Sequence, residues 1–67
     1  MNKSYVLLRM YDALCAGGGL RVSQCREEYD ISLSTFRRYM AFLRGYFSEN
    51  RGKEIVYRAD TGEYVLK

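Results

Sequence analysis

The stretch DISLSTFRRYMAFLRGYF, residues 30–47, constrains this chain more than any other. Its large apolar residues recur at intervals of four, three and four: Phe36, Met40, Leu43 and Phe47. At about 100° per residue, that spacing places the four side chains on one narrow face of a helix. The hydroxyl of Ser32 can accept a hydrogen bond from a free N–H group at the start of such a helix. We therefore predict a helix from Leu33 to about Phe47.

The same stretch carries the whole net charge of the chain, which is +3 at pH 7. Residues 1–30 hold four basic and four acidic side chains, and residues 48–67 again hold four of each. Arg37, Arg38 and Arg44 therefore account for the excess, and no acidic residue lies among them. A helix with one apolar face and only positive charges elsewhere favours a polyanionic partner.

The length of 67 residues allows a single domain, residues 1–67, with one small core. The hydrophobic content of 48% and the absence of proline indicate a compact fold rather than a disordered tail. No apolar run approaches the roughly 18 residues of a membrane helix, and the N-terminus lacks a signal-peptide pattern. We therefore expect no membrane association and a cytoplasmic location.

Metal, redox and enzymatic chemistry find little support in the sequence. There is no His and no CxxC motif, so neither a zinc site nor a redox motif is indicated, and we expect no cofactor. Cys15 and Cys25 fall on predicted apolar helix faces, which predicts two reduced thiols in the core. No nucleophile–base pair occurs, and Glu27 and Glu28 are neighbours on an exposed helix. We do not expect an enzyme.

A first helix is expected to begin after Ser4, which can cap it, and to end near Ala16. The glycine triplet at residues 17–19 supplies the positive φ that a helix C-terminus favours. The sequence predicts this apolar face for the first helix: Leu7, Leu8, Tyr11, Leu14 and Cys15. Val6 and Met10 lie off this face, so the helix is apolar on more than one side.

A second, shorter helix is expected to begin at Val22 or Ser23 and to end near Tyr29. Its apolar residues, Val22, Cys25 and Tyr29, recur at three- and four-residue spacing. Asp30 follows where the chain must turn sharply, and Asp tolerates the left-handed conformation better than most residues.

A β-hairpin is expected at the end of the chain. Residues 54–58, EIVYR, and residues 63–66, EYVL, alternate and are rich in β-branched and aromatic side chains. Between them ADTG forms a short loop ending in glycine. Two strands alone are unstable in water, so the hairpin must pack on the helices, with Leu20 as a candidate third strand. From the two strands, Val56 or Tyr57 and Tyr64 or Leu66 are expected in the core.

This order of elements is typical of a winged helix-turn-helix. Residues 20–32, LRVSQCREEYDIS, resemble the second helix and turn of DeoR-type bacterial regulators, a domain also found at the N-terminus of WYL-domain regulators. Residues 35–40, TFRRYM, are similar to their T-[IV]-R-R-D-L signature, and EYVL resembles the G-G-Y-R-L that closes their wing. The resemblance implies an α+β fold, a small winged helix-turn-helix of three helices with a C-terminal two- or three-stranded β-wing.

Three positions depart from the family pattern. Arg26 stands where alanine is usual, at the close contact between the second and third helices. Asp30 replaces a glycine in the turn, and Tyr39 replaces the acidic residue after the arginine pair. Full-length members also carry a C-terminal ligand-sensing or WYL domain, which residues 1–67 do not contain.

The resemblance implies sequence-specific binding of double-stranded DNA as a bacterial-type transcriptional regulator, with residues 33–47 reading the major groove. Helix angles favour Arg38 as the reader of a guanine edge and Arg37 as a phosphate contact. One domain with few phosphate contacts should bind weakly, so regulation would need a homodimer or a missing C-terminal effector domain. The predicted DNA-binding residues are Ser32, Ser34, Thr35, Arg37, Arg38, Arg44, Arg51, Lys53 and Arg58.

The alternative is a winged-helix module for protein–protein interaction. Phe42 lies opposite the apolar face of the long helix, and its ring would either contact another subunit or pack under the wing, the commoner arrangement. In this alternative, Phe42, Tyr46 and Met10 form an exposed patch and the arginine pair is incidental. DNA binding through phosphates should weaken steeply as salt rises, whereas binding through an aromatic patch should not.

Overall fold

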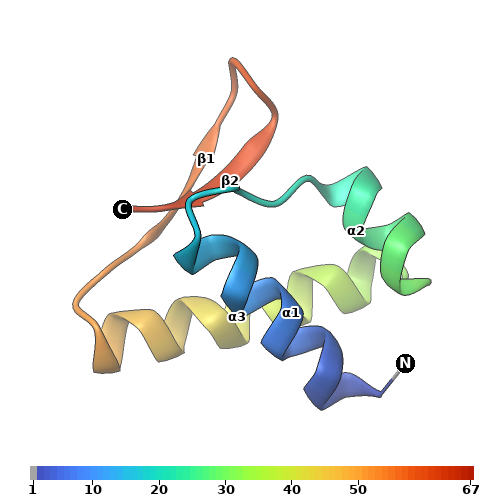
Figure 1. Cartoon of the computed structure of the whole chain (residues 1–67), viewed down its shortest axis with the longest axis horizontal. Helices are drawn as coiled ribbons and strands as arrows, with labels where there is room; N and C mark the ends of the chain where they lie inside the picture. The colour runs from blue at the N-terminus through green and yellow to red at the C-terminus, as the bar shows by residue number, and fades with distance from the viewer. Residues whose placement is uncertain (1) are drawn as a thin grey trace.

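The computed structural model describes residues 2–67 and shows three helices followed by a two-stranded antiparallel sheet, an α+β arrangement (Figure 1). The elements are α1 (Lys3–Cys15), α2 (Val22–Tyr29), α3 (Leu33–Asn50), β1 (Ile55–Arg58) and β2 (Glu63–Leu66). In Figure 1, α1 crosses α3, and the β-hairpin projects from the top of the view, away from the N-terminus. Within residues 2–67, no helix combines the length and apolar content needed to cross a bilayer.

Helix α3 buries the face that the sequence predicts. Ser32 is its N-cap and accepts a hydrogen bond from the Thr35 N–H at 3.1 Å. The four predicted apolar residues of this helix are all buried, and Tyr39 joins them. The helix continues to Asn50, about one turn beyond the predicted end, and the Asn50 amide donates to the Tyr46 carbonyl at 3.0 Å. Apolar spacing missed this last turn because its side chains are polar and exposed.

Helix α1 is rotated from its predicted orientation. Its buried residues are Val6, Met10 and Leu14, and the first two lie off the predicted face. Leu8 and Cys15 were predicted in the core and are exposed, whereas Leu7 and Tyr11 are partly buried against it. The prediction was wrong because apolar residues lie on several sides of this helix, so their spacing alone does not select one face.

The N-cap of α1 also differs from the prediction. Asn2, not Ser4, caps the helix, and its side-chain oxygen accepts from the Tyr5 N–H at 2.8 Å. Asn is as good an N-cap as Ser, so the chemistry permits either residue.

Helix α2 and the turn after it agree with the prediction. Cys25 and Tyr29 are buried, and Asp30 adopts the left-handed conformation with φ 53° and ψ 52°. Arg26, however, is exposed, so it does not occupy the expected close contact between α2 and α3. The departure from alanine at this position therefore does not crowd the helix pair.

The hairpin has the predicted strands and loop. Arg58 pairs with Glu63, and the four-residue loop between them ends at Gly62, whose φ is 73°. Leu20 joins β2 through two backbone hydrogen bonds with Tyr64, each 2.8 Å long, so the candidate third strand is present as a single bridge. These bonds tie the loop before α2 to the hairpin.

The hairpin reaches the core through its base rather than its tip. Ile55 is buried, Val56 is half-buried and Tyr57 is exposed, so Ile55 is a core residue that the sequence prediction missed. Tyr64 and Leu66 pack against the core, as expected. Strand alternation puts Ile55 and Tyr57 on the same face of the hairpin, but only Ile55 lies close enough to the helices to be buried against them.

Candidate nucleic-acid interface

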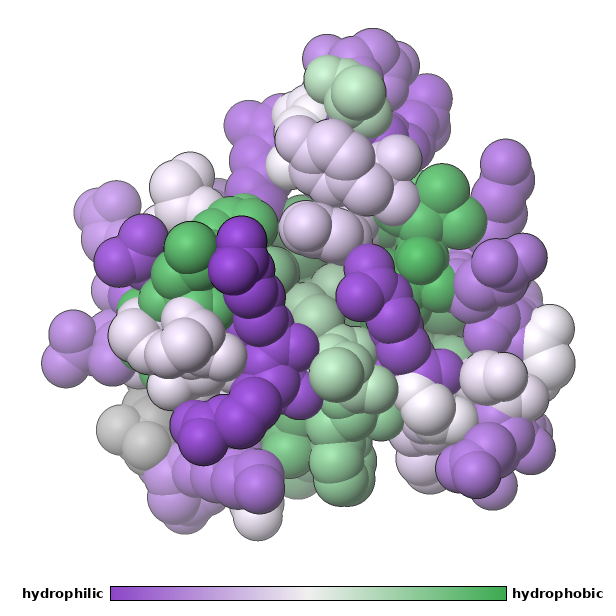
Figure 2. All heavy atoms as spheres, turned by 180° about the vertical axis from the view of Figure 1, so that it is seen from behind, coloured by the Kyte–Doolittle hydropathy of each residue, from purple (hydrophilic) through white to green (hydrophobic). Residues whose placement is uncertain are grey.

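The outer face of α3 presents short residues between arginines. At about 100° per residue, Arg37 and Arg44 lie on one flank of this face and Arg38 lies on the other. All three arginines are exposed. Figure 2, which views the molecule from the α3 side, shows strongly hydrophilic side chains on both sides of a paler strip beneath the hairpin. The short exposed residues along this face are Ser34, Ala41 and Gly45.

A group of hydroxyls surrounds the start of α3. The Ser32 Oγ lies 3.0 Å from the Thr35 Oγ1 and 3.1 Å from the Ser34 Oγ, in addition to capping the helix. Arg38 donates to the Thr35 Oγ1 at 3.4 Å. Ser32 is therefore engaged in holding the start of the helix, while Thr35 orients the guanidinium group of Arg38.

Arg44 and Lys53 come together where α3 meets the hairpin. The guanidinium carbon of Arg44 lies 5.8 Å from the centre of the Tyr64 ring, a distance typical of a cation–π contact. Arg44, Ser48 and Lys53 line the same surface hollow of about 450 Å³, together with Glu54. The predicted DNA-binding residues Arg44 and Lys53 are thus neighbours, although they are nine positions apart in the sequence.

Arg51 and Arg58 lie apart from this group. Arg51 donates to the Tyr11 hydroxyl at 2.7 Å and so ties the end of α3 to α1. Arg58, on the hairpin, forms an ion pair with Asp60 at 3.5 Å, which offsets its charge locally. The structure therefore brings the predicted residues Arg44 and Lys53 together and gathers Ser32, Ser34, Thr35 and Arg38 at the start of α3. Arg37 is exposed on the flank of α3 between these two groups.

Tyr57 was not among the predicted site residues. Its ring is exposed and lies 4.9 Å from that of Tyr64, which in turn lies 5.9 Å from Phe36. This aromatic series connects the core beneath α3 to the outside of the hairpin. The sequence predicts either Val56 or Tyr57 in the core, and in the structure Val56 is the half-buried one while Tyr57 is exposed.

An apolar groove lies between α1 and α3. Its volume is about 400 Å³, and its walls are Leu7, Leu8, Tyr11, Phe42, Leu43 and Tyr46. Phe42 is 60% exposed beside α1, so its predicted packing under the wing is wrong. Met10 is 0% exposed and therefore does not belong to the predicted aromatic patch. Leu8, at 64% exposure, lies on this surface instead.

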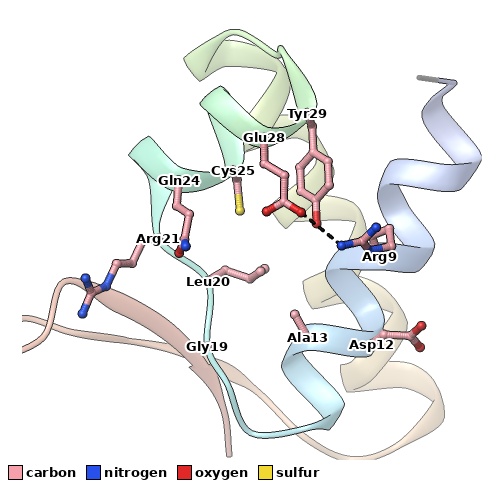
Figure 3. Close-up of a pocket in the computed structure, with 10 residues that line it drawn as sticks. All are labelled: Arg9, Asp12, Ala13, Gly19, Leu20, Arg21, Gln24, Cys25, Glu28 and Tyr29. Atoms are coloured by element: carbon pink, nitrogen blue, oxygen red, sulfur yellow. Dashed lines mark hydrogen bonds and ion pairs between the residues drawn. The ribbon is translucent and has the colours of Figure 1, made fainter.

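A more polar hollow of about 370 Å³ lies between α1 and α2 (Figure 3). Arg9 and Glu28 form an ion pair across it at 3.0 Å. Burial, together with the nearby charge of Glu28, raises the pKa of the Cys25 thiol to about 11. At neutral pH this thiol is protonated and a poor nucleophile. The predicted burial of Cys25 is confirmed, whereas Cys15 is exposed.

No protein-family model, curated protein or solved structure matches this chain. Its function is therefore inferred from the chemistry and geometry of α3 and the hairpin.

Proposed function

We propose that this chain is a small winged helix-turn-helix domain that binds double-stranded DNA as a bacterial-type transcriptional regulator, with α3 in the major groove. The observation that carries the proposal is the position of the net charge. Arg37, Arg38 and Arg44, which account for the excess, are exposed on α3, and its one acidic residue, Glu49, lies in the last turn. None of these arginines is engaged in an ion pair within residues 2–67. Such a helix attracts the phosphate backbone on both sides of a groove.

The shape of α3 supports insertion into the major groove, which is about 12 Å wide and accommodates one helix. The short residues Ser34, Ala41 and Gly45 allow the helix axis to approach the base edges closely. Arg38 then lies nearly opposite the buried face, toward the base edges, and Arg37 lies nearer the edge, toward a phosphate. Arg38, oriented by Thr35, is our candidate for a bidentate contact with guanine.

The flank nearest the hairpin supports phosphate binding. Arg37 and Arg44 lie on this flank, and Lys53 joins Arg44 at the base of the hairpin. The hairpin is the wing in this proposal. Because Arg58 is paired with Asp60, the wing adds little electrostatic attraction. Tyr57 is an exposed residue of the wing, and its hydroxyl is the better donor to a phosphate.

The proposal predicts distinct effects for the two neighbouring arginines. Arg38→Ala should weaken binding to a preferred sequence by about 1–3 kcal/mol and relax the preference at one base position. Arg37→Ala should weaken binding to all sequences alike and lower the salt slope by about one unit. Fluorescence anisotropy with a preferred duplex, selected from a random library, and with a scrambled duplex at several salt concentrations measures both effects.

Arg26→Ala is the matched control, because Arg26 is also an exposed helical arginine but belongs to α2. Its affinity and salt slope should change much less than those of the α3 variants. Circular dichroism verifies that each variant is folded. A folded double variant, Arg37→Ala with Arg38→Ala, that binds DNA with unchanged affinity and salt slope would refute the assignment of α3 as the reading helix.

A further inference from the structure

A seam of exposed residues runs along α3 next to the arginine that we assign to base reading. Arg38, Phe42, Gly45 and Glu49 recur at intervals of four, three and four, which is the spacing of a helix–helix contact seam. All four are exposed. Of the two central residues, Phe42 carries a large ring and Gly45 has no side chain. Neither Arg38 nor Glu49 takes part in an ion pair within residues 2–67.

This seam is complementary to itself when a second helix runs antiparallel to the first. Arg38 and Glu49 lie at equal distances on either side of a midpoint between residues 43 and 44, and so do Phe42 and Gly45. A two-fold axis through that midpoint therefore brings opposite charges together at both ends and a ring onto a glycine at both central positions. One register satisfies all four contacts, as an isologous interface requires.

We propose that a second copy of this chain packs against α3 through this seam. Each Phe42 ring covers Gly45 of the other copy, and each Arg38 pairs with Glu49 of the other copy. The space is available, because a Cβ built on Gly45 would meet no atom within 4 Å. The absence of a side chain there is what lets the two helices approach closely.

Apolar residues beside the seam enlarge the contact. Leu8 is 64% exposed and Tyr46 is 40% exposed, and both line the α1–α3 groove together with Phe42. An aromatic side chain buries about 150–250 Å² when fully covered, so these partly exposed residues supply only a few hundred Å² per copy. Stable interfaces bury more than about 1,000 Å² in total. The dimer should therefore dissociate readily on dilution.

This dimer cannot read DNA in the usual two-site manner. Packed helices lie about 8–10 Å apart, whereas the reading helices of a dimer on adjacent half-sites lie about 34 Å apart. The seam also uses Arg38 and covers Gly45 on the outer face of α3. Self-association should thus compete with DNA binding, a consequence that rests on the proposed function, whereas the dimer itself does not.

Sedimentation equilibrium without DNA tests the dimer. The unmodified chain should pass from monomer to dimer as its concentration rises. Arg38→Glu and Glu49→Arg should each weaken association by about tenfold or more, because each places like charges together. The double reversal, Arg38→Glu with Glu49→Arg, should restore most of it. A chain that stays monomeric up to high micromolar concentration, or a double reversal that restores nothing, would overturn the proposal.

Phe42→Ser provides a second test, because this exposed side chain can be replaced without opening the core. It should abolish association, while Tyr5→Ser, at an exposed aromatic residue outside the seam, should leave it intact. Association that depends on Phe42 but is unaffected by either charge reversal would overturn this register.

A final measurement separates the dimer from the DNA proposal. If both hold, adding duplex DNA should dissociate the dimer, and the apparent DNA affinity per chain should fall at high protein concentration for the unmodified chain but not for Phe42→Ser. A dimer that forms as described while no variant binds DNA would refute the proposed function alone. A dimer that binds DNA without dissociating would overturn the competition.

Discussion

Helices α3 and α1 are both rich in apolar residues, yet only α3 has an orientation that its sequence determines. In α3, Phe36 and its periodic partners form one continuous apolar face, and the arginines and short residues lie on the opposite side, with only the exposed rings of Phe42 and Tyr46 beside them. In α1, Val6, Leu7, Leu8 and Met10 spread around most of the helix. The buried face of α1 lies about one residue's rotation, roughly 100°, from the face that the spacing favours.

The difference shows that the polar residues of a helix carry as much information as the apolar ones. Apolar spacing identifies a helix, but its orientation is defined by the side on which an apolar residue is absent. Helix α1 offers only Arg9 and Asp12 as charged residues within its central turns. Two charges leave a wide range of orientations, and the contacts with α3 and the hairpin then select one.

The largest expected effect concerns two phenylalanines of α3. Phe36 is 1% exposed and Phe42 is 60% exposed. Phe36→Ala should lower the free energy of unfolding by about 3–5 kcal/mol, because it removes a large ring from the core. Phe42→Ala should change it by about 0.5 kcal/mol or less. Urea unfolding followed by circular dichroism, at dilutions that exclude self-association, measures both. Equal losses would contradict the assigned orientation of α3.

A slightly smaller effect tests the rotation of α1. Met10 is fully buried although the sequence favours its neighbours, whereas Leu8 is exposed although the sequence places it in the core. Met10→Ala should cost about 2–5 kcal/mol, and Leu8→Ala should cost about 0.5 kcal/mol or less. The same unfolding measurements apply to this pair. The reverse ranking would restore the orientation that spacing alone favours.

Much of the fold follows from local chemistry and was therefore predictable. The order of the elements, the cap at Ser32, the left-handed Asp30 and the hairpin loop ending at Gly62 each depend on residues close together in the sequence. The features that were missed depend on distant residues. The position of Phe42 beside α1 and the exposure of Cys15 both require the packing of α1 to be known.

The candidate site divides in the same way. The exposure of Arg37, Arg38 and Arg44 was predictable, because a helix with a single apolar face must present its other residues to solvent. The hydrogen bond from Arg51 to Tyr11 was not, since it joins residues 40 positions apart. It assigns Arg51 to holding α3 against α1, and a side chain held in this way is less free to bind a phosphate.

The smallest expected effect compares the N-caps of the two helices. Ser32 accepts from the Thr35 N–H at 3.1 Å, and Asn2 accepts from the Tyr5 N–H at 2.8 Å, so both make the same kind of bond. Ser32→Ala should cost about 1 kcal/mol, because its helix begins at a tight turn held between α2 and the core. Asn2→Ala should cost less, since Lys3, Ser4 and Tyr5 in the first turn of α1 are exposed, and this turn can fray without exposing buried side chains. Ser48→Ala, at an exposed serine in the last turn of α3 and away from both caps, is the control and should have little effect. Unfolding measurements rank the three variants, and amide hydrogen exchange at Thr35 and Tyr5 reports each cap directly. If Asn2→Ala proved the costlier of the two caps, the start of α1 would be as firmly held as the start of α3, and the contrast between the two helices would not extend to their ends.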